Sequence, residues 1–223
     1  MVAAAEVGSL ALGGGDRWSD LDLTFGIAEG VSIEEVLDDF SERVVREFAA
    51  ARLFDLPFGS SLYRVFLLPG CLQVDLSVTP AAEFGAHSPK FRLVFGEAVE
   101  KPYPPDPDPH ELFGWAVHDA VRARFSLERG KLWLAEFHIG ELRNYALSLA
   151  CLRRGLPAKY GRGLDQLPED ALTGFEETLA RAMKPAELLR ALRAGVEVLL
   201  RESSDLGEVV ESVEPRLREV ISG

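Results

Sequence analysis

The stretch GSLALGGGDRWSDLDL, residues 8–23, is the most informative part of this 223-residue chain. Apolar and polar residues alternate from Asp20 onward, which predicts a half-buried β-strand. Asp20 and Asp22 are two positions apart on that strand, so both carboxylates project from the same face. Two hard oxygen ligands placed so close together suit one or two Mg²⁺ ions that carry phosphates.

The pair Gly8-Ser9 opens this stretch, directly after a short apolar segment at residues 3–7 that we predict to be a strand. Backbone N–H groups exposed at such a turn, together with the serine hydroxyl, can hold phosphate oxygens. Phosphoryl and nucleotidyl transfer needs both a phosphate cradle and a metal that orients in-line attack. The stretch therefore combines the two halves of such a site.

The segment that follows alternates between helix-like and strand-like patterns. A helix is predicted over residues 32–48, with Ser32 as its N-cap. A hairpin is predicted over residues 62–68 and 72–78, joined by a Pro-Gly turn, and a further strand over residues 91–95. In the second hairpin strand Asp75 lies on the polar face, so it is a third carboxylate that the sheet can bring to the first two.

A proline-rich stretch, KPYPPDPDP at residues 101–109, separates this half from the rest, because its prolines exclude a helix interior or a central strand. Beyond it the chain reads as five helices in an antiparallel bundle, over residues 110–129, 131–154, 170–182, 185–202 and 205–221. We predict an α+β N-terminal domain, with a mixed sheet and helices, at residues 1–104. An all-α helical bundle domain, which binds the acceptor substrate, is predicted at residues 105–223. Trp115, Trp133 and Phe137 are predicted to pack in this bundle, with the alternative that one of them stacks on a base or sugar.

The order of these features resembles the polymerase-β-like nucleotidyltransferase superfamily. There, Gly-Ser precedes an Asp-hydrophobic-Asp pair by about a dozen residues, and a later strand carries the third carboxylate. The DRWSDLDL stretch at residues 16–23 is especially similar to the bacterial branch with aminoglycoside and lincosamide nucleotidyltransferases, which also carry a helical C-terminal domain. One departure is Leu12, at a position where relatives commonly have a basic residue.

The resemblance implies roles for particular residues. Asp20, Asp22 and Asp75 are expected to be catalytic and to bind Mg²⁺, with Asp75 either a metal ligand or the base that deprotonates the acceptor. The expected nucleotide is ATP, and the residues expected to bind it are Gly8, Ser9, Ser19 and Arg143.

One predicted helix supplies further candidates. Glu136, Gly140 and Arg143 lie along one flank of the apolar stripe of the helix at residues 131–154. In the aminoglycoside enzymes an acidic residue from outside the Asp-x-Asp strand is thought to act as general base. By that resemblance Glu136 is the first candidate for the base, and Glu141 is the second. Glu and Arg beside a helix core also commonly form a partly exposed ion pair of under about 1 kcal/mol, and this reading stays open.

The charge of the chain restricts its partners. Lys and Arg total 24 against 36 Asp and Glu, a net charge of −12. An acidic surface repels nucleic acid and anionic lipid and attracts cations. There is no basic leader before the N-terminal apolar stretch and no apolar run near the roughly 20 residues that span a bilayer. With only two, widely separated cysteines, we expect a cytoplasmic protein without disulfides, bound to neither nucleic acid nor membrane.

The expected function is Mg²⁺-dependent transfer of a nucleoside monophosphate from an NTP to a hydroxyl of a small, cationic acceptor, as in antibiotic-modifying enzymes. Two alternatives stay open: a toxin–antitoxin-type nucleotidyltransferase that modifies a protein partner, and a non-catalytic nucleotide-binding module. A homodimer also stays open, because active sites in the antibiotic enzymes can be shared between subunits.

Overall fold

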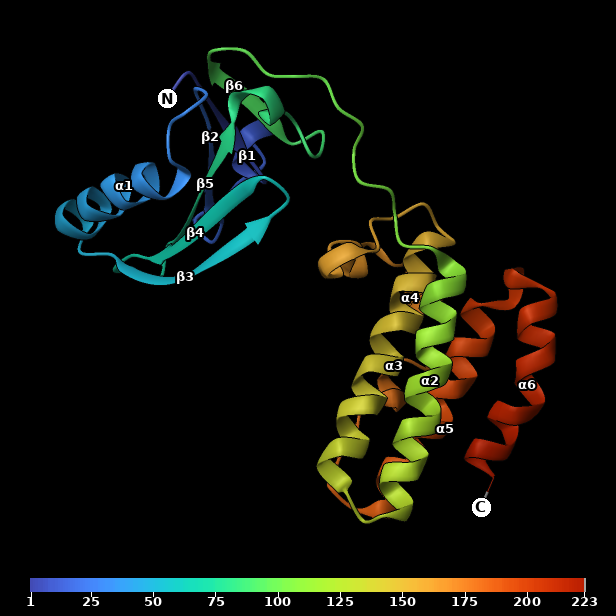
Figure 1. Ribbon diagram of the computed structural model, residues 1–223. Helices are drawn as coiled ribbons and strands as arrows, with labels where there is room; N and C mark the ends of the chain where they lie inside the picture. Colours follow the sequence, from blue (N-terminus) through green and yellow to red (C-terminus); the bar gives the residue numbers. More distant parts are fainter. Residues whose placement is uncertain (223) are drawn as a thin grey trace. The chain divides into compact units, whose positions relative to one another are not determined.

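The structure is a computed structural model that describes residues 1–222 (Figure 1). The chain forms two compact units, Met1–Pro104 and a second unit that begins at Pro105. The predicted fold class is confirmed, because the first unit is a mixed sheet with a helix and the second is all-helical. The roles predicted for domains 1–104 and 105–223 stay predictions.

The first unit is built on a six-stranded sheet in the order β3-β4-β5-β2-β1-β6. Strands β2 and β5 run parallel at its centre, and the other neighbours pair antiparallel. The strands are β1 (Ala3–Val7), β2 (Leu21–Ile27), β3 (Ala51–Phe58), β4 (Ser61–Leu67), β5 (Gln73–Pro80) and β6 (Phe91–Phe95). The predicted hairpin is therefore β4–β5, and the strand predicted at residues 91–95 is β6.

The strand β3 was not predicted from the sequence. It lies at the edge of the sheet, where seven of its eight residues are exposed, so its side chains show no apolar–polar alternation. It also contains Pro57, which an edge strand tolerates because one side of the strand has no ladder partner. For both reasons, the pattern of apolar and polar residues does not predict this edge strand.

Helix α1 (Ile33–Phe48) packs against one face of this sheet. Ser32 caps it as predicted, because its side chain accepts a hydrogen bond from the backbone N–H of Glu35. Apolar residues of β2 and β5 pack with the buried Leu37 of this helix, among them Leu23 and Leu76. Since side chains alternate along a strand, the aspartates between these residues project from the opposite face of the sheet.

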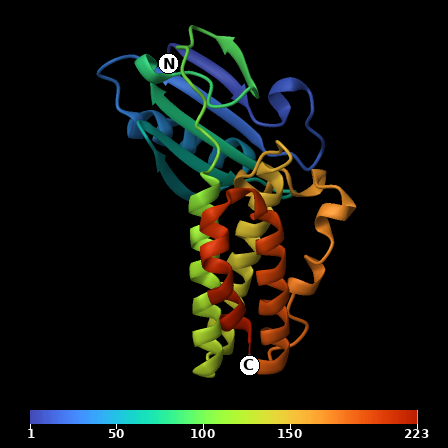
Figure 2. The ribbon, with the colours of Figure 1, turned by 90° about the vertical axis from the view of Figure 1, so that its right-hand side faces the viewer.

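The second unit contains four long helices, α2 (Pro109–Glu128), α3 (Leu132–Leu152), α5 (Pro185–Glu202) and α6 (Glu208–Ile221), which pack side by side (Figure 2). The prediction of five long helices was wrong at residues 170–182. That segment forms only the short helix α4 (Glu169–Leu172) and a 3₁₀ turn, because Gly174 has a left-handed backbone with φ +85° that no α-helix continues. The last helix begins at Glu208, after Gly207, whose backbone has a positive φ of +61° that an α-helix does not contain.

Small residues set the contact between α2 and α3. Ala116 and Ala120 on α2 and Ala135 on α3 are fully buried in the core of the unit, and short side chains let helix backbones approach closely. The prediction that aromatic residues fill the bundle was wrong for Trp115, Trp133 and Phe137, whose side chains are exposed. Among the described residues, no helix is both long and apolar enough to cross a bilayer.

Candidate metal centre

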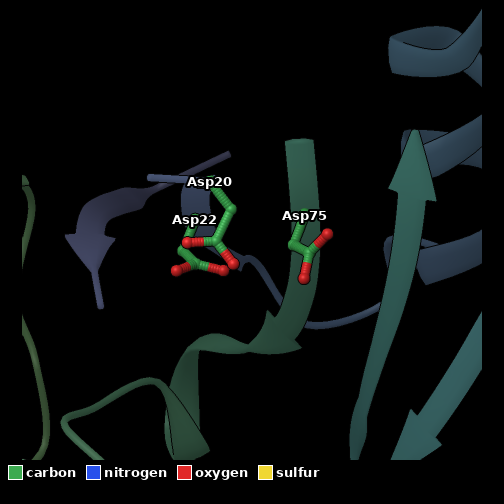
Figure 3. A group of neighbouring side chains, drawn as sticks. All are labelled: Asp20, Asp22 and Asp75. Carbon is green, nitrogen blue, oxygen red and sulfur yellow. The ribbon is translucent and has the colours of Figure 1, made fainter. Parts of the chain in front are cut away.

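The sheet brings the three predicted aspartates together. Asp22 on β2 and Asp75 on β5 are direct partners across the parallel pair, and Asp20 comes immediately before β2. In Figure 3 the side chains of Asp20 and Asp22 lie next to each other, and Asp75 projects from the neighbouring strand. Each residue offers one carboxylate oxygen, and the three oxygens lie within 4.8 Å of one another.

These carboxylates fit a divalent cation. All three side chains are partly exposed, so a cation can reach them from solvent. Carboxylate oxygens are the ligands that Mg²⁺ prefers, and Mg²⁺ keeps its other positions for water and substrate phosphates. The donor set therefore suits Mg²⁺ held by Asp20, Asp22 and Asp75, which would neutralise the charge of bound phosphates.

The electrostatics of the site also favour a bound cation. Burial raises the pKa of Asp75 above its usual range, and the nearby charge of Asp20 raises it further. A hydrogen bond from Nε2 of Gln73 to Oδ1 of Asp75, at 3.1 Å, acts against this rise. A bound cation would offset the repulsion between the carboxylates.

Tyr63 on β4 is a neighbour of the site that sequence reasoning missed. Burial raises the pKa of its phenol, a hydrogen bond with Ser77 acts against this, and the charges of Asp22 and Asp75 raise it further. The signal that could have found it is the register of the hairpin, which places Tyr63 opposite Ser77, two residues beyond Asp75.

Gly8 and Ser9 follow the last residue of β1, Val7, which pairs with Asp22. Gly8 has a left-handed backbone with φ +75°, and a Cβ atom there would lie 2.2 Å from Oδ2 of Asp22. The hydroxyl of Ser9 is buried and has no hydrogen-bond partner among the described residues. Since buried polar groups normally have partners, this hydroxyl, which follows the glycine that contacts Asp22, is suited to a ligand oxygen.

We expect Gly8→Ala to reduce Mg²⁺-dependent nucleotide binding more than about tenfold, because the new methyl group must displace the Asp22 carboxylate. The matched control is Gly30→Ala, which adopts a similar backbone angle (φ +79°) with no atom within 4 Å of the added Cβ. Backbone strain should lower the stability of both variants by about 1 kcal/mol. Titration with a non-hydrolysable ATP analogue checks the difference, and equal affinities for the two variants would contradict it.

We expect Ser9→Ala to leave the free protein as stable as the wild type or slightly more stable, because it removes an unpaired buried hydroxyl. The same change should weaken nucleotide binding by about tenfold, which is the contribution of one hydrogen bond to a charged group. Ser41→Ala should instead lower the stability and leave nucleotide binding unchanged, since the Ser41 hydroxyl donates to the Leu37 carbonyl and accepts from Arg64. Thermal unfolding and the nucleotide titration distinguish the two outcomes.

The loop before β2 is internally braced. Oδ1 of Asp16 accepts the backbone N–H of Trp18 at 2.8 Å and the Ser19 hydroxyl at 3.3 Å. The Ser19 hydroxyl in turn accepts the backbone N–H of Asp16 at 2.9 Å. Ser19 therefore shapes the approach to Asp20, and its predicted contact with nucleotide stays a prediction.

Glu136 and Arg143 lie on α3 of the helical unit. Nη1 of Arg143 donates to the Thr178 carbonyl at 3.1 Å, which ties the segment after α4 to α3. Nη2 of Arg143 lies 3.5 Å from the point where a Cβ atom on Gly140 would lie, so these two residues are neighbours, as the helix pattern predicts. The base role of Glu136 and the phosphate contact of Arg143 stay predictions.

Sequence reasoning also missed a buried pair between α2 and α3. Nδ1 of His138 lies 2.6 Å from Oδ1 of Asp119, and both side chains are about nine-tenths buried. Nε2 of His138 is buried without a hydrogen-bond partner among the described residues. Asp119 precedes the turn at Gly130 and His138 follows it, so the packing of α2 against α3 brings the two residues together.

Comparison with solved structures gives distant matches, one of which is described here. No protein-family model matches the sequence, and no curated protein matches it. The chain is similar to the crystal structure of an aminoglycoside 6-adenyltransferase from Bacillus subtilis, over 96% of this chain and 95% of that chain. The identity is 12% and the TM-score is 0.43, so the site rests on its own geometry.

Proposed function

We propose that the protein is a Mg²⁺-dependent nucleotidyltransferase that moves a nucleoside monophosphate from an NTP to a hydroxyl group of a small acceptor. The observation that carries this proposal is the set of three carboxylates, with oxygens within 4.8 Å, next to Gly8 and the unpaired hydroxyl of Ser9. A carboxylate cluster and a phosphate-holding turn at one end of a sheet are the two parts that nucleotidyl transfer needs.

The chemistry is a single displacement at the α-phosphorus. The acceptor oxygen forms a bond to this phosphorus while the bond to the bridging oxygen of pyrophosphate breaks, and pyrophosphate leaves with the electron pair. The hydroxyl proton passes to a carboxylate, for which Asp75 and Glu136 are the candidates. Mg²⁺ held by Asp20 and Asp22, and also by Asp75 if Glu136 is the base, would neutralise the phosphate charge during this displacement.

The acceptor is proposed to be a small cationic molecule of the aminoglycoside kind, with ATP as the nucleotide. The net charge of −12 attracts a polycation and disfavours nucleic acid as a substrate.

Labelled transfer tests the proposal directly. The protein is incubated with ATP labelled at the α-phosphate, Mg²⁺ and a panel of aminoglycosides and other hydroxyl-bearing compounds. We expect label to move to an acceptor with one pyrophosphate released per transfer, and EDTA to stop both. Label on a co-expressed protein instead would favour the toxin–antitoxin alternative, and no transfer with either would favour a binding module.

Glu136→Gln is expected to lower turnover by about 100-fold with little change in ATP affinity, because a general base acts in the transition state. The matched control is Glu128→Gln on α2, an exposed carboxylate of the same unit that accepts a hydrogen bond from Arg124. Single-turnover rates and nucleotide titrations separate the two effects. An unchanged rate in Glu136→Gln would assign the base to Asp75 or Glu141.

A further inference from the structure

A cavity of about 280 Å³ opens beside Asp20. Its walls come from two segments of the first unit: the loop before β2 and the turn between β4 and β5. The residues that matter for its chemistry are Arg17, Trp18, Asp20, Cys71, Leu72 and Gln73. The proposed function assigns no role to this cavity.

The strand order places the cavity and the Gly8–Ser9 turn on opposite flanks of β2. Gly8 and Ser9 follow β1, which pairs with one edge of β2. The cavity lies towards β5, which pairs with the other edge. Asp20 lines the cavity, and Asp22 pairs with Val7 of β1 on one side and with Asp75 of β5 on the other.

The geometry of in-line displacement relates the positions of the turn and the cavity to the two oxygens of the reaction. The attacking and leaving oxygens lie on opposite sides of the phosphorus. If the Gly8–Ser9 turn holds the leaving pyrophosphate, the acceptor oxygen must arrive from the β5 side, where the cavity opens. Gln73 connects the cavity to the catalytic carboxylates, because its side chain lines the cavity and donates to Asp75.

The lining of the cavity indicates the class of acceptor. The Trp18 side chain is 77% exposed, although burying an indole is normally favourable, and the Arg17 guanidinium stacks on its ring at 4.1 Å. Trp18 and Leu72 offer apolar surface, while Arg17, Gln73 and Asp20 offer donors and acceptors around it. This combination suits a sugar or aminocyclitol ring, which has apolar C–H faces and a polar edge. The volume lies just below the roughly 300–1,000 Å³ of ligand sites, enough for one such ring.

We propose that this cavity is the acceptor subsite, and that it takes a hydroxyl-bearing sugar or aminocyclitol ring stacked beside Trp18 with one hydroxyl directed to the carboxylates. The proposal rests on the proposed function and deepens it, because it names where the acceptor binds and which part of the acceptor is recognised.

The experiment uses two reporters in the cavity wall. Trp115→Phe with Trp133→Phe leaves Trp18 as the single tryptophan, and both replaced residues are exposed in the helical unit. Cys71 is exposed at the cavity while Cys151 is buried, so N-ethylmaleimide labels Cys71 in the folded chain. Monosaccharides, 2-deoxystreptamine and an aminoglycoside are titrated at saturating Mg²⁺ and non-hydrolysable ATP analogue, with Cys71→Ser as the labelling control.

We expect at least one ring compound to change Trp18 emission and to slow Cys71 alkylation more than about fivefold, whereas the analogue alone changes the alkylation rate less than about twofold. Protection by the analogue alone would overturn the proposal, since the cavity would then belong to the nucleotide. Binding of the analogue with no response to any ring compound would also overturn it and leave the proposed function intact. Failure of the analogue to bind would remove the proposed function, and this proposal with it.

Discussion

Asp20→Asn is expected to reduce nucleotidyl transfer at least about 1,000-fold, because loss of one metal-binding carboxylate removes several kcal/mol of charge stabilisation in the transition state. Asp22→Asn should have the same effect, since both carboxylates belong to the cluster within 4.8 Å. Thermal stability should stay the same or rise in both variants, because neighbouring carboxylates repel each other when no cation is bound. Transfer rates and calorimetric Tm values measure the two effects on the same preparations.

The matched control for this prediction is Asp39→Asn on α1, which removes an exposed carboxylate outside the cluster. It should change neither the transfer rate nor the Tm. Wild-type turnover in Asp20→Asn or Asp22→Asn would show that the metal assignment is wrong. A loss of activity with a large loss of stability would show that the aspartate supports the fold rather than the chemistry.

Asp55→Ala is expected to destabilise the sheet unit by about 3 kcal/mol, because it removes the main partner of a buried arginine. The Arg64 side chain is 3% exposed and donates two hydrogen bonds of 2.8 Å to the Asp55 carboxylate. Asp38 accepts a third hydrogen bond from Arg64, at 2.6 Å, and its survival keeps the loss at the lower end of the range for broken buried pairs. Urea unfolding of the full chain measures the change.

The control for Asp55 is Glu47→Ala, which breaks the exposed Arg46–Glu47 pair. Pairs of that kind contribute little, so the free energy of unfolding should change by less than about 0.5 kcal/mol. An equal loss of unfolding free energy in Asp55→Ala and Glu47→Ala would show that contacts other than the ion pair with Asp55 stabilise Arg64.

The same pair predicts how stability depends on pH. The hydrogen bonds from Arg64 lower the pKa of Asp55 below its ordinary value of 3.8. A carboxyl whose pKa is lowered by folding stabilises the folded state above pH 3.8 and loses this contribution as the pH falls below that value. Acid titration of unfolding should therefore be flatter in Asp55→Asn than in the wild type.

The sequence predicted the elements of the site because local patterns determine them. Alternation predicts that the carboxylates of Asp22 on β2 and of Asp20 immediately before it project to one face, and alternation in β5 assigns Asp75 to its polar face. The parallel pairing that joins Asp22 to Asp75 depends on sheet order, which no local pattern contains. It came from the resemblance, and the structure shows this pairing.

Other features depend on contacts between distant segments or on single backbone angles. The buried pair of His138 and Asp119 and the unpaired hydroxyl of Ser9 exist only after packing, so neither has a periodic signal. The helix predicted over residues 170–182 is interrupted at Gly174, whose left-handed backbone ends it although the apolar residues on both sides have helical spacing. Trp18 is exposed and lines the cavity, and no pattern in the sequence predicts either property.

Calorimetric titration of the purified protein with a non-hydrolysable ATP analogue tests the central claim most directly. The titration is made with Mg²⁺, repeated after addition of EDTA, and repeated with Asp20→Asn. We predict binding that requires Mg²⁺ and disappears both with EDTA and in the variant. Binding that persists in EDTA and in Asp20→Asn, or no binding by the wild type at all, would contradict a nucleotide site built on Asp20, Asp22 and Asp75.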